Sequence, residues 1–381
     1  MRRKRALELQ EIRNSLDVID KQMAALFEKR MDLCAQVARI KAESGKAVYD
    51  GQREAQKLAA IGSLAEDGFA RQDLEELFSQ IMTMSRRMQY RILTGGERPS
   101  NLGFQAVDEL KKKGARVAYQ GVEGSYGHGA ALQYFGDEGI LYHVPAMEDA
   151  MVEVEEGRAD FGVLPIENSS AGAVSNNYDL LVRHNVYIVA EIQIPVRHAL
   201  LGLPKAVLSD IRRVYSHPQA LMQSSKYLKA NREWQLISAE NTAWAAKKIW
   251  EDGDITQAAV ASETAGRLYG LKTLACPINY DINNTTRFIV LSKYPVYRRD
   301  AGKVSICFEC AHKSGALYNM LGNLIYNHIN MLMIESRPIE GRSWEYRFFV
   351  DMEGSLGDAG MQNALAGIRA EAAALRILGN Y

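Results

Sequence analysis

The chain has 381 residues, of which 47% are apolar and 24% are charged, so it is long enough for two or three domains with buried cores. Lys and Arg together number 46, as do Asp and Glu, so no net field attracts nucleic acid or an anionic membrane. No stretch approaches the roughly 20 apolar residues of a membrane span, and no apolar segment follows the basic start. We therefore expect a cytoplasmic protein without a membrane or nucleic-acid partner.

The four cysteines are too few and too scattered to indicate a disulfide framework, and they suit a reducing compartment. Cys307 and Cys310 have the spacing of a metal-binding pair. However, residues 304–309 are predicted to form a strand, in which positions three apart face opposite sides. No second pair accompanies them, so we predict neither a metal site nor a cofactor.

Residues 8–42 are predicted to form one long helix, followed by shorter helices at about 51–66 and 71–93. Such a segment offers too few partners to cover the long helix, so we expect it to pair antiparallel with a second copy of the chain. The apolar residues that recur at the helical period are Ile12, Leu16, Ile19, Met23, Leu26, Phe27, Leu33, Val37 and Ile40.

Charged side chains lie among these apolar positions. Arg30 and Lys41 fall within roughly 20° of each other around the helix axis and about 16 Å apart along it. They either snorkel at the helix edge or face an anion that neutralises them. Arg13 lies about 25 Å from Arg30, so one small ligand could meet both only if Arg13 came from a partner chain. The polar positions of the segment are Arg13, Arg30, Lys41, Asp50, Arg53, Glu54, Ser85 and Gln89.

In type and spacing these eight positions resemble the substrate residues of the all-helical chorismate mutases, over about residues 5–93. The resemblance implies rearrangement of chorismate to prephenate, which needs only a folded substrate and a stabilised ether oxygen. Ser85 would belong to the same site. Arginines 13, 30 and 53 would hold carboxylates. Lys41 and Gln89 would donate to the ether oxygen, and Asp50 and Glu54 would accept from the ring hydroxyl or orient the cations.

After a breaker-rich linker at 96–113, which includes a short helix-like piece before Lys111, the pattern changes to alternating strands and helices. This alternation predicts an α/β domain with largely parallel sheets, whose ligands collect at the carboxyl ends of the strands. The glycine-rich loop 121–129 matches no nucleotide-binding fingerprint. Strands are expected at 116–119, 160–166, 186–194, 212–216, 234–237, 257–261 and 287–292, and helices from about 130 and at 175–184.

Polar side chains stand where several of these strands begin or end. The stretch Asn283–Phe288 places hydroxyls and a guanidinium at the mouth of a buried strand, either as a polar turn or as a place to hold an anion. Other polar side chains follow the expected strands at 116–119, 160–166 and 212–216. The candidates are Ser125, Glu167, Asn168, Ser216, Gln223, Thr286 and Arg287.

The Thr-Arg-Phe at 286–288, with Gly-Ser-Tyr at 124–126 and the polar strand ends, resembles the prephenate dehydratases. The resemblance implies a two-lobed domain like the periplasmic binding proteins at 114–297, which converts prephenate to phenylpyruvate in its cleft. Thr286 would donate a hydrogen bond to the leaving hydroxyl, effective because water is excluded. Arg287 would meet a carboxylate or hold the loop. Asn168, Ser216 and Gln223 would position the substrate, with Glu167 in support.

Two features of this domain are left open. His128 and His217 are alternative acids, although structural roles are favoured for both. Gly127 stands where the family usually has Ser, which leaves that loop one hydroxyl short.

Residues 301–381 follow the order strand, helix, strand, strand, helix, strand, which is that of a ferredoxin-like α+β fold. The expected strands are 303–309, 329–335, 344–352 and 373–378, and the helices 314–327 and 358–371. The segment resembles an ACT domain, and its Glu-Ser-Arg-Pro resembles the phenylalanine-sensing version. The resemblance implies backbone N–H groups that face the carboxylate of phenylalanine near Gly315, with Glu335 on its amino group. The candidate regulatory residues are Gly315, Ala316, Leu317, Asn330, Glu335, Ser336, Arg337 and Pro338.

Together these resemblances imply a multidomain enzyme: an all-α chorismate mutase domain at 1–95, an α/β dehydratase domain at 114–297 and an α+β ACT domain at 301–381. It would convert chorismate through prephenate to phenylpyruvate and be inhibited by phenylalanine. A homodimer or a larger homo-oligomer is expected, with Arg13 acting in trans. The alternatives are a non-catalytic sensor of aromatic metabolites and a protein in which one of the two catalytic domains is inactive.

Overall fold

The computed structural model describes residues 2–46, 48–94 and 102–381, and the chain divides into two compact units. The first unit comprises residues 1–100, 308–331 and 356–375, and the second comprises 101–307, 332–355 and 376–381. Across the described residues, no helix combines the length and the apolar character needed to cross a bilayer.

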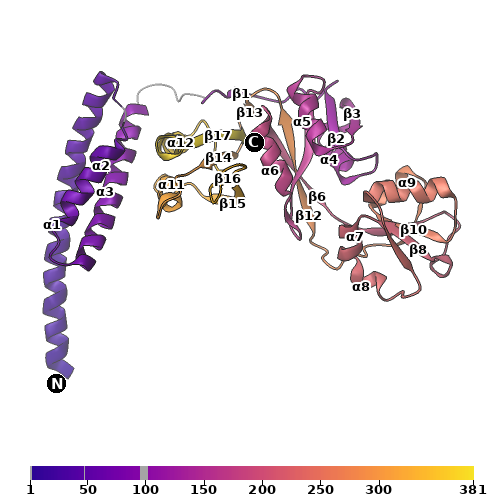
Figure 1. Ribbon diagram of the computed structural model, residues 1–381, viewed down its shortest axis with the longest axis horizontal. Helices are drawn as coiled ribbons and strands as arrows, with labels where there is room; N and C mark the ends of the chain where they lie inside the picture. Colours follow the sequence, from indigo (N-terminus) through magenta and orange to yellow (C-terminus); the bar gives the residue numbers. More distant parts are fainter. Residues whose placement is uncertain (1, 47, 95–101) are drawn as a thin grey trace. The chain divides into compact units, whose positions relative to one another are not determined.

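The N-terminal part of the first unit is helical, as the sequence predicts. It consists of α1 (Arg2–Ser44), α2 (Gly51–Gly62) and α3 (Gly68–Thr94), and α3 packs against both other helices (Figure 1). Asp50 caps α2 by accepting a hydrogen bond from the backbone N–H of Arg53 at 3.0 Å. The same unit contains α11 (Ala316–Ile325) and α12 (Ala359–Glu371).

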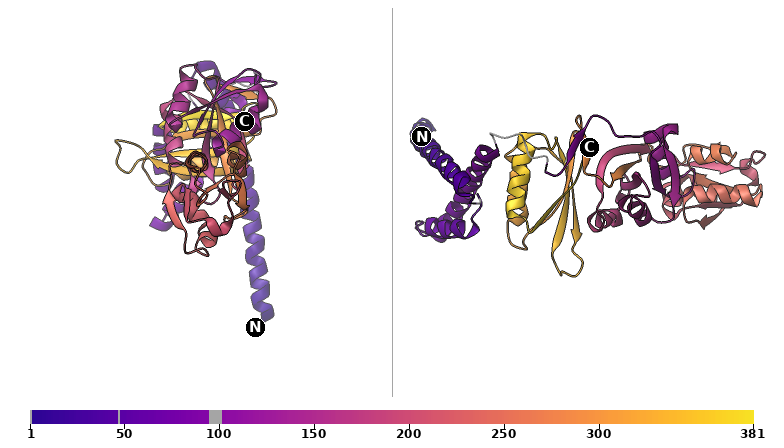
Figure 2. Two further views of the ribbon diagram at one scale, coloured as in Figure 1. Left: turned by 90° about the vertical axis from the view of Figure 1, so that its right-hand side faces the viewer. Right: turned by 90° about the horizontal axis from the view of Figure 1, so that it is seen from above.

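The apolar stripe of α1 is left largely uncovered. Ile12 is 58% exposed, Leu26 67% and Ile40 64%, and most of the other apolar positions of the stripe are also exposed. The N-terminal part of α1 extends beyond α2 and α3 (Figures 1 and 2). So long an exposed apolar face is unusual on the surface of a monomeric protein.

The second unit contains a ten-stranded sheet with the order β15-β16-β14-β17-β6-β12-β4-β2-β3, in which β5 pairs with β4. The strands at one end, with α4, α5 and α6, form lobe A, which covers residues 116–195 and 285–292. Its elements are β2 (Arg116–Gln120), α4 (Tyr126–Phe135), β3 (Ile140–Val144), α5 (Met147–Glu155), β4 (Phe161–Asn168), β5 (Gly172–Ala173), α6 (Ser175–Arg183), β6 (Tyr187–Pro195) and β12 (Thr285–Ser292). A short 3₁₀ helix, η1 (Gly136–Glu138), follows α4.

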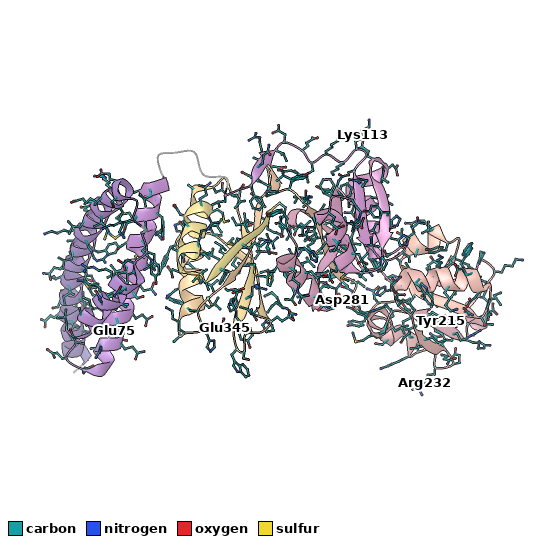
Figure 3. The ribbon with its side chains drawn as sticks, turned by 45° about the horizontal axis from the view of Figure 1, so that its top comes forward. Glu75, Lys113, Tyr215, Arg232, Asp281 and Glu345 are labelled. Carbon is teal, nitrogen blue, oxygen red and sulfur yellow. The ribbon has the colours of Figure 1, made fainter. Side chains whose placement is uncertain are left out.

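The chain leaves lobe A at the end of β6, builds lobe B from residues 196–284, and returns in β12. Lobe B has a five-stranded sheet with the order β11-β7-β10-β8-β9 and carries Tyr215 and Arg232 (Figure 3). Its elements are β7 (Ala199–Gly202), η2 (Leu208–Asp210), β8 (Arg213–Ser216), α7 (Pro218–Gln223), α8 (Ser225–Leu228), β9 (Gln235–Ser238), α9 (Thr242–Asp252), β10 (Gln257–Ala261), α10 (Glu263–Leu268) and β11 (Lys272–Ala275).

The remaining strands of the large sheet are β14 (Lys303–Glu309), β15 (Met331–Pro338), β16 (Tyr346–Glu353) and β17 (Ala374–Asn380). With α11 and α12 they follow the chain order strand, helix, strand, strand, helix, strand that the sequence predicts. Their identification as an ACT domain stays a prediction, as do the domain boundaries.

Two structural expectations are wrong. The sheets are mixed rather than largely parallel, since β12 is antiparallel to both β4 and β6, and β7 is antiparallel to β10 and β11. The cause is the chain path, because β12 returns from lobe B against the direction of β6. The helix-like piece before Lys111 is also absent among the described residues there. Instead β1 (Gln105–Val107) pairs with β13 (Val296–Arg298), and the linker residues 95–101 lie outside the described residues.

The alternation of β12 sorts its side chains onto the two faces of lobe A. Phe288 and Val290 belong to the apolar cluster that contains Ala130 and Ala131 of α4. Ile289 and Leu291 belong to another cluster, which also includes Met151, Leu181 and, from the C-terminal strands, Phe349. Because successive residues of a strand face opposite sides, Thr286 follows the first set and Arg287 the second.

Candidate active sites

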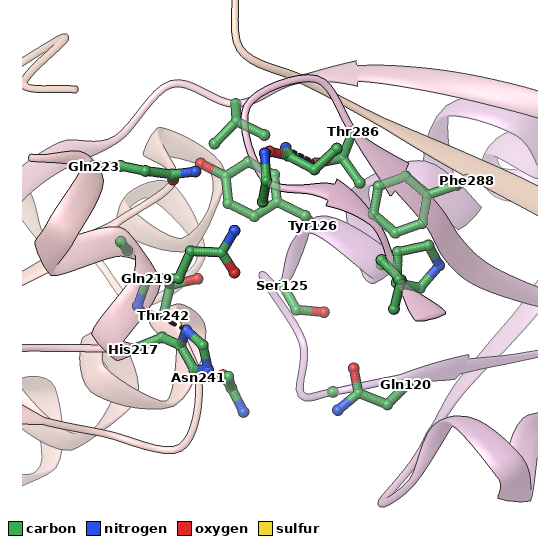
Figure 4. A pocket seen from close by; sticks show the side chains of 18 of the residues that line it. Gln120, Ser125, Tyr126, His217, Gln219, Gln223, Asn241, Thr242, Thr286 and Phe288 are labelled. Carbon is green, nitrogen blue, oxygen red and sulfur yellow. Dashed lines mark hydrogen bonds between the residues drawn. The ribbon is translucent and has the colours of Figure 1, made fainter. Parts of the chain in front are cut away.

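A cavity of about 470 Å³ lies between the two lobes of the second unit. Thr286, Phe288, Ser125 and Gln120 line one side of it, and residues of lobe B line the other (Figure 4). Four of the predicted dehydratase residues, Ser125, Asn168, Gln223 and Thr286, are among its lining residues, although they come from four separate parts of the chain. The polar lining also includes Tyr126, His198, His217, Gln219, Asn241 and Thr242. None of these was among the predicted site residues, although His217 was named as an alternative acid.

The hydroxyl of Thr286 is oriented by Asn168. The amide Nδ2 of Asn168 donates to Thr286 Oγ1 at 2.8 Å and to the side-chain oxygen of Asn284, also at 2.8 Å. The other end of the Asn168 amide, Oδ1, accepts from the backbone N–H groups of Ser170 and Ala171 at 3.1 and 3.0 Å, which fixes the direction of the amide. Because Thr286 Oγ1 accepts a hydrogen bond, its own O–H remains available to donate into the cavity.

The cavity holds no formal side-chain cation. None of its described lining residues is Lys, Arg, Asp or Glu. Instead, the N-terminal caps of four helices line it: Ser125 before α4, Val174 before α6, His217 before α7 and Asn241 before α9. The first N–H groups of a helix and its dipole present partial positive charge, so this arrangement is suited to an anion.

A buried histidine connects the two lobes at one end of the cavity. His198 is 2% exposed; its Nε2 lies 2.9 Å from Gln223 Oε1 and its Nδ1 lies 3.2 Å from the Tyr126 hydroxyl. Since the glutamine oxygen can only accept, His198 donates through Nε2 and accepts from Tyr126 through Nδ1. Burial lowers the pKa of His198, against the hydrogen bond with Gln223, so the ring is neutral near pH 7.

The two histidines that the sequence singled out differ in position. His217 lines the cavity, and its Nδ1 accepts from the backbone N–H of Gln219 at 3.2 Å. His128 is not among the lining residues, and its Nδ1 accepts from the N–H of Gly124 at 3.1 Å. Burial lowers the pKa of both imidazoles, which suits neutral hydrogen-bonding groups better than proton donors.

Three predicted dehydratase residues lie outside the cavity lining. Ser216 is fully buried, and its hydroxyl donates to the carbonyl of Val260. Arg287 points to the opposite face of β12 and pairs with Glu167, whose Oε2 lies 3.2 Å from its Nε. The sequence could have indicated this direction, because Thr286 and Arg287 are adjacent in a strand and cannot both face the cavity.

The backbone around position 127 gives a steric reason for the glycine there. A Cβ added there would lie 2.9 Å from the carbonyl oxygen of Gln120, closer than such atoms normally approach. A serine at this position would therefore require the loop to shift.

In the first unit, two predicted mutase residues, Arg30 of α1 and Ser85 of α3, are in contact. Arg30 donates to the hydroxyl of Ser85, which is 3% exposed, and Lys41 donates to the carbonyl of Val48 at 2.7 Å. Gln89 is 7% exposed, and its Oε1 has no hydrogen-bond partner among the described residues. A buried acceptor without a partner costs stability, so a purely structural role explains Gln89 poorly.

The other predicted mutase residues are more exposed. Arg13 and Arg53 are exposed, and Asp50 acts as the cap of α2. Glu54 forms an ion pair with Arg86, a buried residue that the sequence reasoning did not select. The position of Arg86 in the sequence, between the predicted site residues Ser85 and Gln89, could have indicated it.

The predicted effector residues are divided between the two units. Gly315 adopts a left-handed conformation with φ of 74° and precedes the first residue of α11, Ala316, with Leu317 next and Asn330 before β15. In the second unit, Glu335, Ser336, Arg337 and Pro338 belong to β15, where Arg337 pairs with Asp179 of α6 at 2.6 Å. Among the described residues no cluster of His, Cys, Asp or Glu could hold a metal ion.

The fold defines a class of protein: a multidomain enzyme with a cavity between two α/β lobes and a separate helical domain. The family models of two enzymes match the corresponding parts, prephenate dehydratase at residues 117–296 and chorismate mutase type II at residues 12–90. The chain belongs to the family of bifunctional chorismate mutase/prephenate dehydratases. It rearranges chorismate to prephenate and converts prephenate to phenylpyruvate in phenylalanine biosynthesis.

Three relatives support the assignment of the chain to this family. The bifunctional chorismate mutase/prephenate dehydratase of Escherichia coli (strain K12) is 32% identical over 97% of this chain and 95% of its own length. The arogenate dehydratase/prephenate dehydratase 1 of Arabidopsis thaliana is 39% identical over 70% of this chain and 71% of its own length. The prephenate dehydratase of Arthrobacter aurescens, solved in complex with L-Phe, is 28% identical with a TM-score of 0.64, and covers 70% of this chain and 89% of its own.

A further solved structure aligns as well but carries another activity. It is described as a novel type of quorum quenching acylase, and is 31% identical with a TM-score of 0.64 over 70% of this chain and 96% of its own.

Proposed function

We propose that the Thr286 hydroxyl, held by Asn168, assists the departure of hydroxide from prephenate in the cavity between the lobes. The observation that carries this proposal is the hydrogen bond from Asn168 Nδ2 to Thr286 Oγ1, which leaves the threonine proton free to donate. A threonine hydroxyl is too weak an acid to give up this proton near neutral pH. It therefore acts as a placed donor that stabilises negative charge on the leaving oxygen.

The reaction balances without a cofactor. The bond between the ring and its carboxylate breaks, carbon dioxide leaves, and the electron pair enters the ring. The ring C–O bond breaks at the opposite carbon, and the oxygen leaves as hydroxide with the electron pair of that bond, to be neutralised by the buffered solvent after release. Aromatisation supplies the driving force, so the chain's own part is to hold the substrate, exclude water and stabilise the leaving oxygen.

The lining also suits the two carboxylates of the substrate. The helix N-termini that follow Ser125, Val174 and Asn241 provide N–H donors for the side-chain carboxylate. Phe288, Pro165 and Met147 provide apolar surface, which favours loss of a ring carboxylate as neutral carbon dioxide. Gln223 and Ser125 are the proposed positioning groups, while Glu167, Ser216 and Arg287 would support the lining from outside it.

The same lining favours prephenate over arogenate, the other substrate named for the Arabidopsis relative. Arogenate carries an ammonium group where prephenate has a ketone. No described lining residue is Asp or Glu, so no carboxylate of the cavity would pair with that ammonium group.

For the mutase reaction, the buried polar groups of the first unit are the proposed substrate contacts. Arg30 and Arg53 would hold carboxylates with Arg13 of a second copy, and Lys41 and Gln89 would donate to the ether oxygen through their N–H groups. Asp50 and Glu54 would accept from the ring hydroxyl or orient the cations, and Ser85 would hold Arg30. The uncovered apolar stripe of α1 supports pairing with that second copy.

Feedback inhibition by phenylalanine completes the proposal. Its support is the βαββαβ order of the C-terminal elements, the left-handed Gly315 at the start of α11, and the L-Phe complex of the Arthrobacter aurescens relative. The effector would bind near Gly315, Ala316, Leu317, Asn330 and the segment Glu335–Pro338 of an ACT domain.

The test is a pair of assays, with chorismate and with prephenate, on matched threonine variants. Thr286→Val removes the donor, so prephenate turnover should fall by roughly 100- to 1,000-fold while chorismate turnover is unchanged. Thr285→Val is the control, because its hydroxyl donates to the carbonyl of Asn283 and does not line the cavity. Equal loss of both activities in Thr286→Val would contradict the assignment. Phenylalanine added to the wild-type prephenate assay should lower turnover, and unchanged turnover would exclude the feedback role.

A further inference from the structure

A buried ionic network lies behind the catalytic strand, on the face of β12 away from the cavity. Arg287 is its centre: its Nη1 lies 2.7 Å from Asp351 Oδ2 and 3.3 Å from Glu191 Oε2. Lys303 in turn lies 2.7 Å from Glu191. Asp351 belongs to β16 and Lys303 to β14, so a carboxylate from the C-terminal strands reaches the residue that follows Thr286.

Asp351 is held firmly from both of its oxygens. It is 5% exposed, and while Oδ2 meets Arg287, Oδ1 accepts from the hydroxyl of Ser305, which lies 2.7 Å from the Tyr381 hydroxyl. The void beside these groups measures only about 10 Å³. That space holds at most one water molecule, so the network does not bind a metabolite.

The surrounding core leaves the network little freedom to move. Ile289 and Leu291 of β12 share one apolar cluster with Phe349 and Leu378 of the C-terminal strands. The two parts of the sheet meet where Gly379 pairs with Ile188, and a Cβ on Gly379 would lie 2.1 Å from the carbonyl oxygen of Ile188. Packed interiors transmit displacement rather than absorb it, so the position of β16 constrains that of β12.

The alternation of side chains along β12 means that a constraint on Arg287 also affects Thr286, which lines the cavity. Thr286 and Arg287 are consecutive residues of β12, so their side chains project to opposite faces of one rigid strand. At Arg287 the ladder with β4 also has a bulge, between the pairs Arg287–Glu167 and Phe288–Pro165. The extra residue of this bulge is Ile166 of β4, while β12 pairs regularly with β6 from Thr285 to Val290. The backbone at Arg287 is therefore held by β6, and its side chain is anchored by Asp351.

We propose that Asp351 is a positioning residue for the dehydratase reaction, acting through Arg287 to hold the Thr286 hydroxyl in register with the leaving oxygen. Asp351 itself touches neither the cavity nor the substrate. The inference rests on the proposed role of Thr286. It adds that the C-terminal strands contribute to the dehydratase reaction even without effector, because the carboxylate that fixes Arg287 belongs to β16.

The test compares Asp351→Asn with Glu340→Gln in the full-length protein, with both substrates and without phenylalanine. Asparagine preserves shape and can still accept from Ser305, but it removes the charge that binds Arg287. We expect kcat for prephenate to fall by roughly 10- to 100-fold, with KM for prephenate and the mutase activity little changed. Glu340 is the control, because its carboxylate pairs with Arg183 on the exposed surface, 87% exposed, and should be replaceable without effect.

The other outcomes decide against the proposal. An unchanged kcat in Asp351→Asn, or a rise in KM alone, would overturn it, and so would an equal loss of both activities in a folded variant. If Asp351→Asn does not fold, Ser305→Ala decides, since it frees Oδ1 but keeps the charge. It should lower kcat in the same direction by a few-fold, and no change would overturn the proposal. Thr286→Val, assayed alongside, separates this result from a failure of the Thr286 assignment.

Discussion

The proposed helical site and the proposed cleft site would bind the same dianion, prephenate, as product and as substrate, but their side chains differ in charge. The helical unit offers the cationic side chains Arg30 and Lys41, both half-buried. The cleft offers helix N-termini, amides and neutral imidazoles, and no Lys or Arg among its described lining residues. Partial charges of the backbone are fixed by the fold itself, whereas Arg30 and Lys41 are long side chains that depend on Ser85 and on the carbonyl of Val48 for their positions.

The contrast matches what each reaction demands. The mutase reaction moves charge within a substrate that keeps both carboxylates, so strong ion pairs can remain throughout. The dehydratase reaction discharges one carboxylate as carbon dioxide, and a tight ion pair to that group would stabilise the substrate more than the transition state. A cavity without formal cations avoids this penalty.

The largest expected effect concerns the cationic site and its second copy. Arg30→Ala and Arg13→Ala should each lower mutase activity by roughly 100- to 1,000-fold, because each leaves a carboxylate unpaired. If Arg13 acts in the partner's site, mixed dimers of the two variants contain one intact site in two. Unfolding and refolding the variants together should therefore restore up to roughly a quarter of wild-type activity, since about half of the dimers are mixed.

Refolding each variant alone provides the control for this mixture. Activity that stays at the level of the single variants would place Arg13 in the same subunit's site, or outside it. Dehydratase activity should be unaffected throughout.

The next effect tests the absence of cations in the cleft. Asn168→Asp replaces the amide that donates to Thr286 with a carboxylate facing a dianionic substrate, whereas Asn168→Ala removes the donor alone. We expect kcat/KM for prephenate to fall further in Asn168→Asp than in Asn168→Ala, by roughly another tenfold, because like charges repel in a poorly solvated site. Equal losses in both variants would mean that a cation neutralises the added charge. Steady-state assays of prephenate turnover distinguish these outcomes.

The smallest effect concerns pH, since the cleft uses buried neutral histidine and the helices at 2–94 contain no histidine. Burial places the pKa of folded His198 below its usual 6.5, so the unfolded chain binds more protons below that pH. The stability that the neutral ring allows is therefore present above pH 6.5 and is lost as the pH falls toward the folded pKa. The slope is at most about 1.4 kcal/mol per pH unit for one histidine.

Urea unfolding at pH 7.5, 6.5 and 5.5, followed by tryptophan fluorescence, measures this slope in lobe B, which carries three of the four tryptophans. His198→Gln should flatten the dependence, and His143→Gln, an exposed residue, should not. A pH dependence of stability in His198→Gln equal to that of the wild type would show that His198 keeps its unfolded pKa, because His128 and His217 are unchanged in both proteins.

Much of the fold follows from the sequence because local periodicity determines it. The helices and most strands lie within a few residues of their expected ranges, since caps such as Asp50 and runs such as 257–261 act locally. The direction of β12 does not follow, because it depends on where residues 196–284 insert. The pairing of β1 with β13 likewise joins segments about 190 residues apart, which no local pattern encodes.

The residues of the candidate site also fall into two groups: those that the sequence predicts and those whose position depends on the fold. Thr286, Asn168, Gln223 and Ser125 were expected to act together, and the structure places them around one cavity. His198 and Asn241 were not selected, because each gains its place only when lobe B folds back over lobe A. The sequence analysis gave Arg287 two possible roles, to meet a carboxylate or to hold the loop. The alternation of side chains in a strand, which directs Arg287 away from the cavity, could have been inferred from the sequence.

The path of the chain through the two lobes has one more consequence. Lobe B begins and ends at the same point, where the N–H of Val196 donates to the carbonyl of Asn284 at 2.8 Å. A short bridge could therefore join the two ends and remove lobe B entirely without breaking the strands of lobe A. Such a miniature would keep the Thr286–Asn168 pair but lose the opposite wall of the cavity, and would thus separate the proposed help for the leaving group from the enclosure of the substrate.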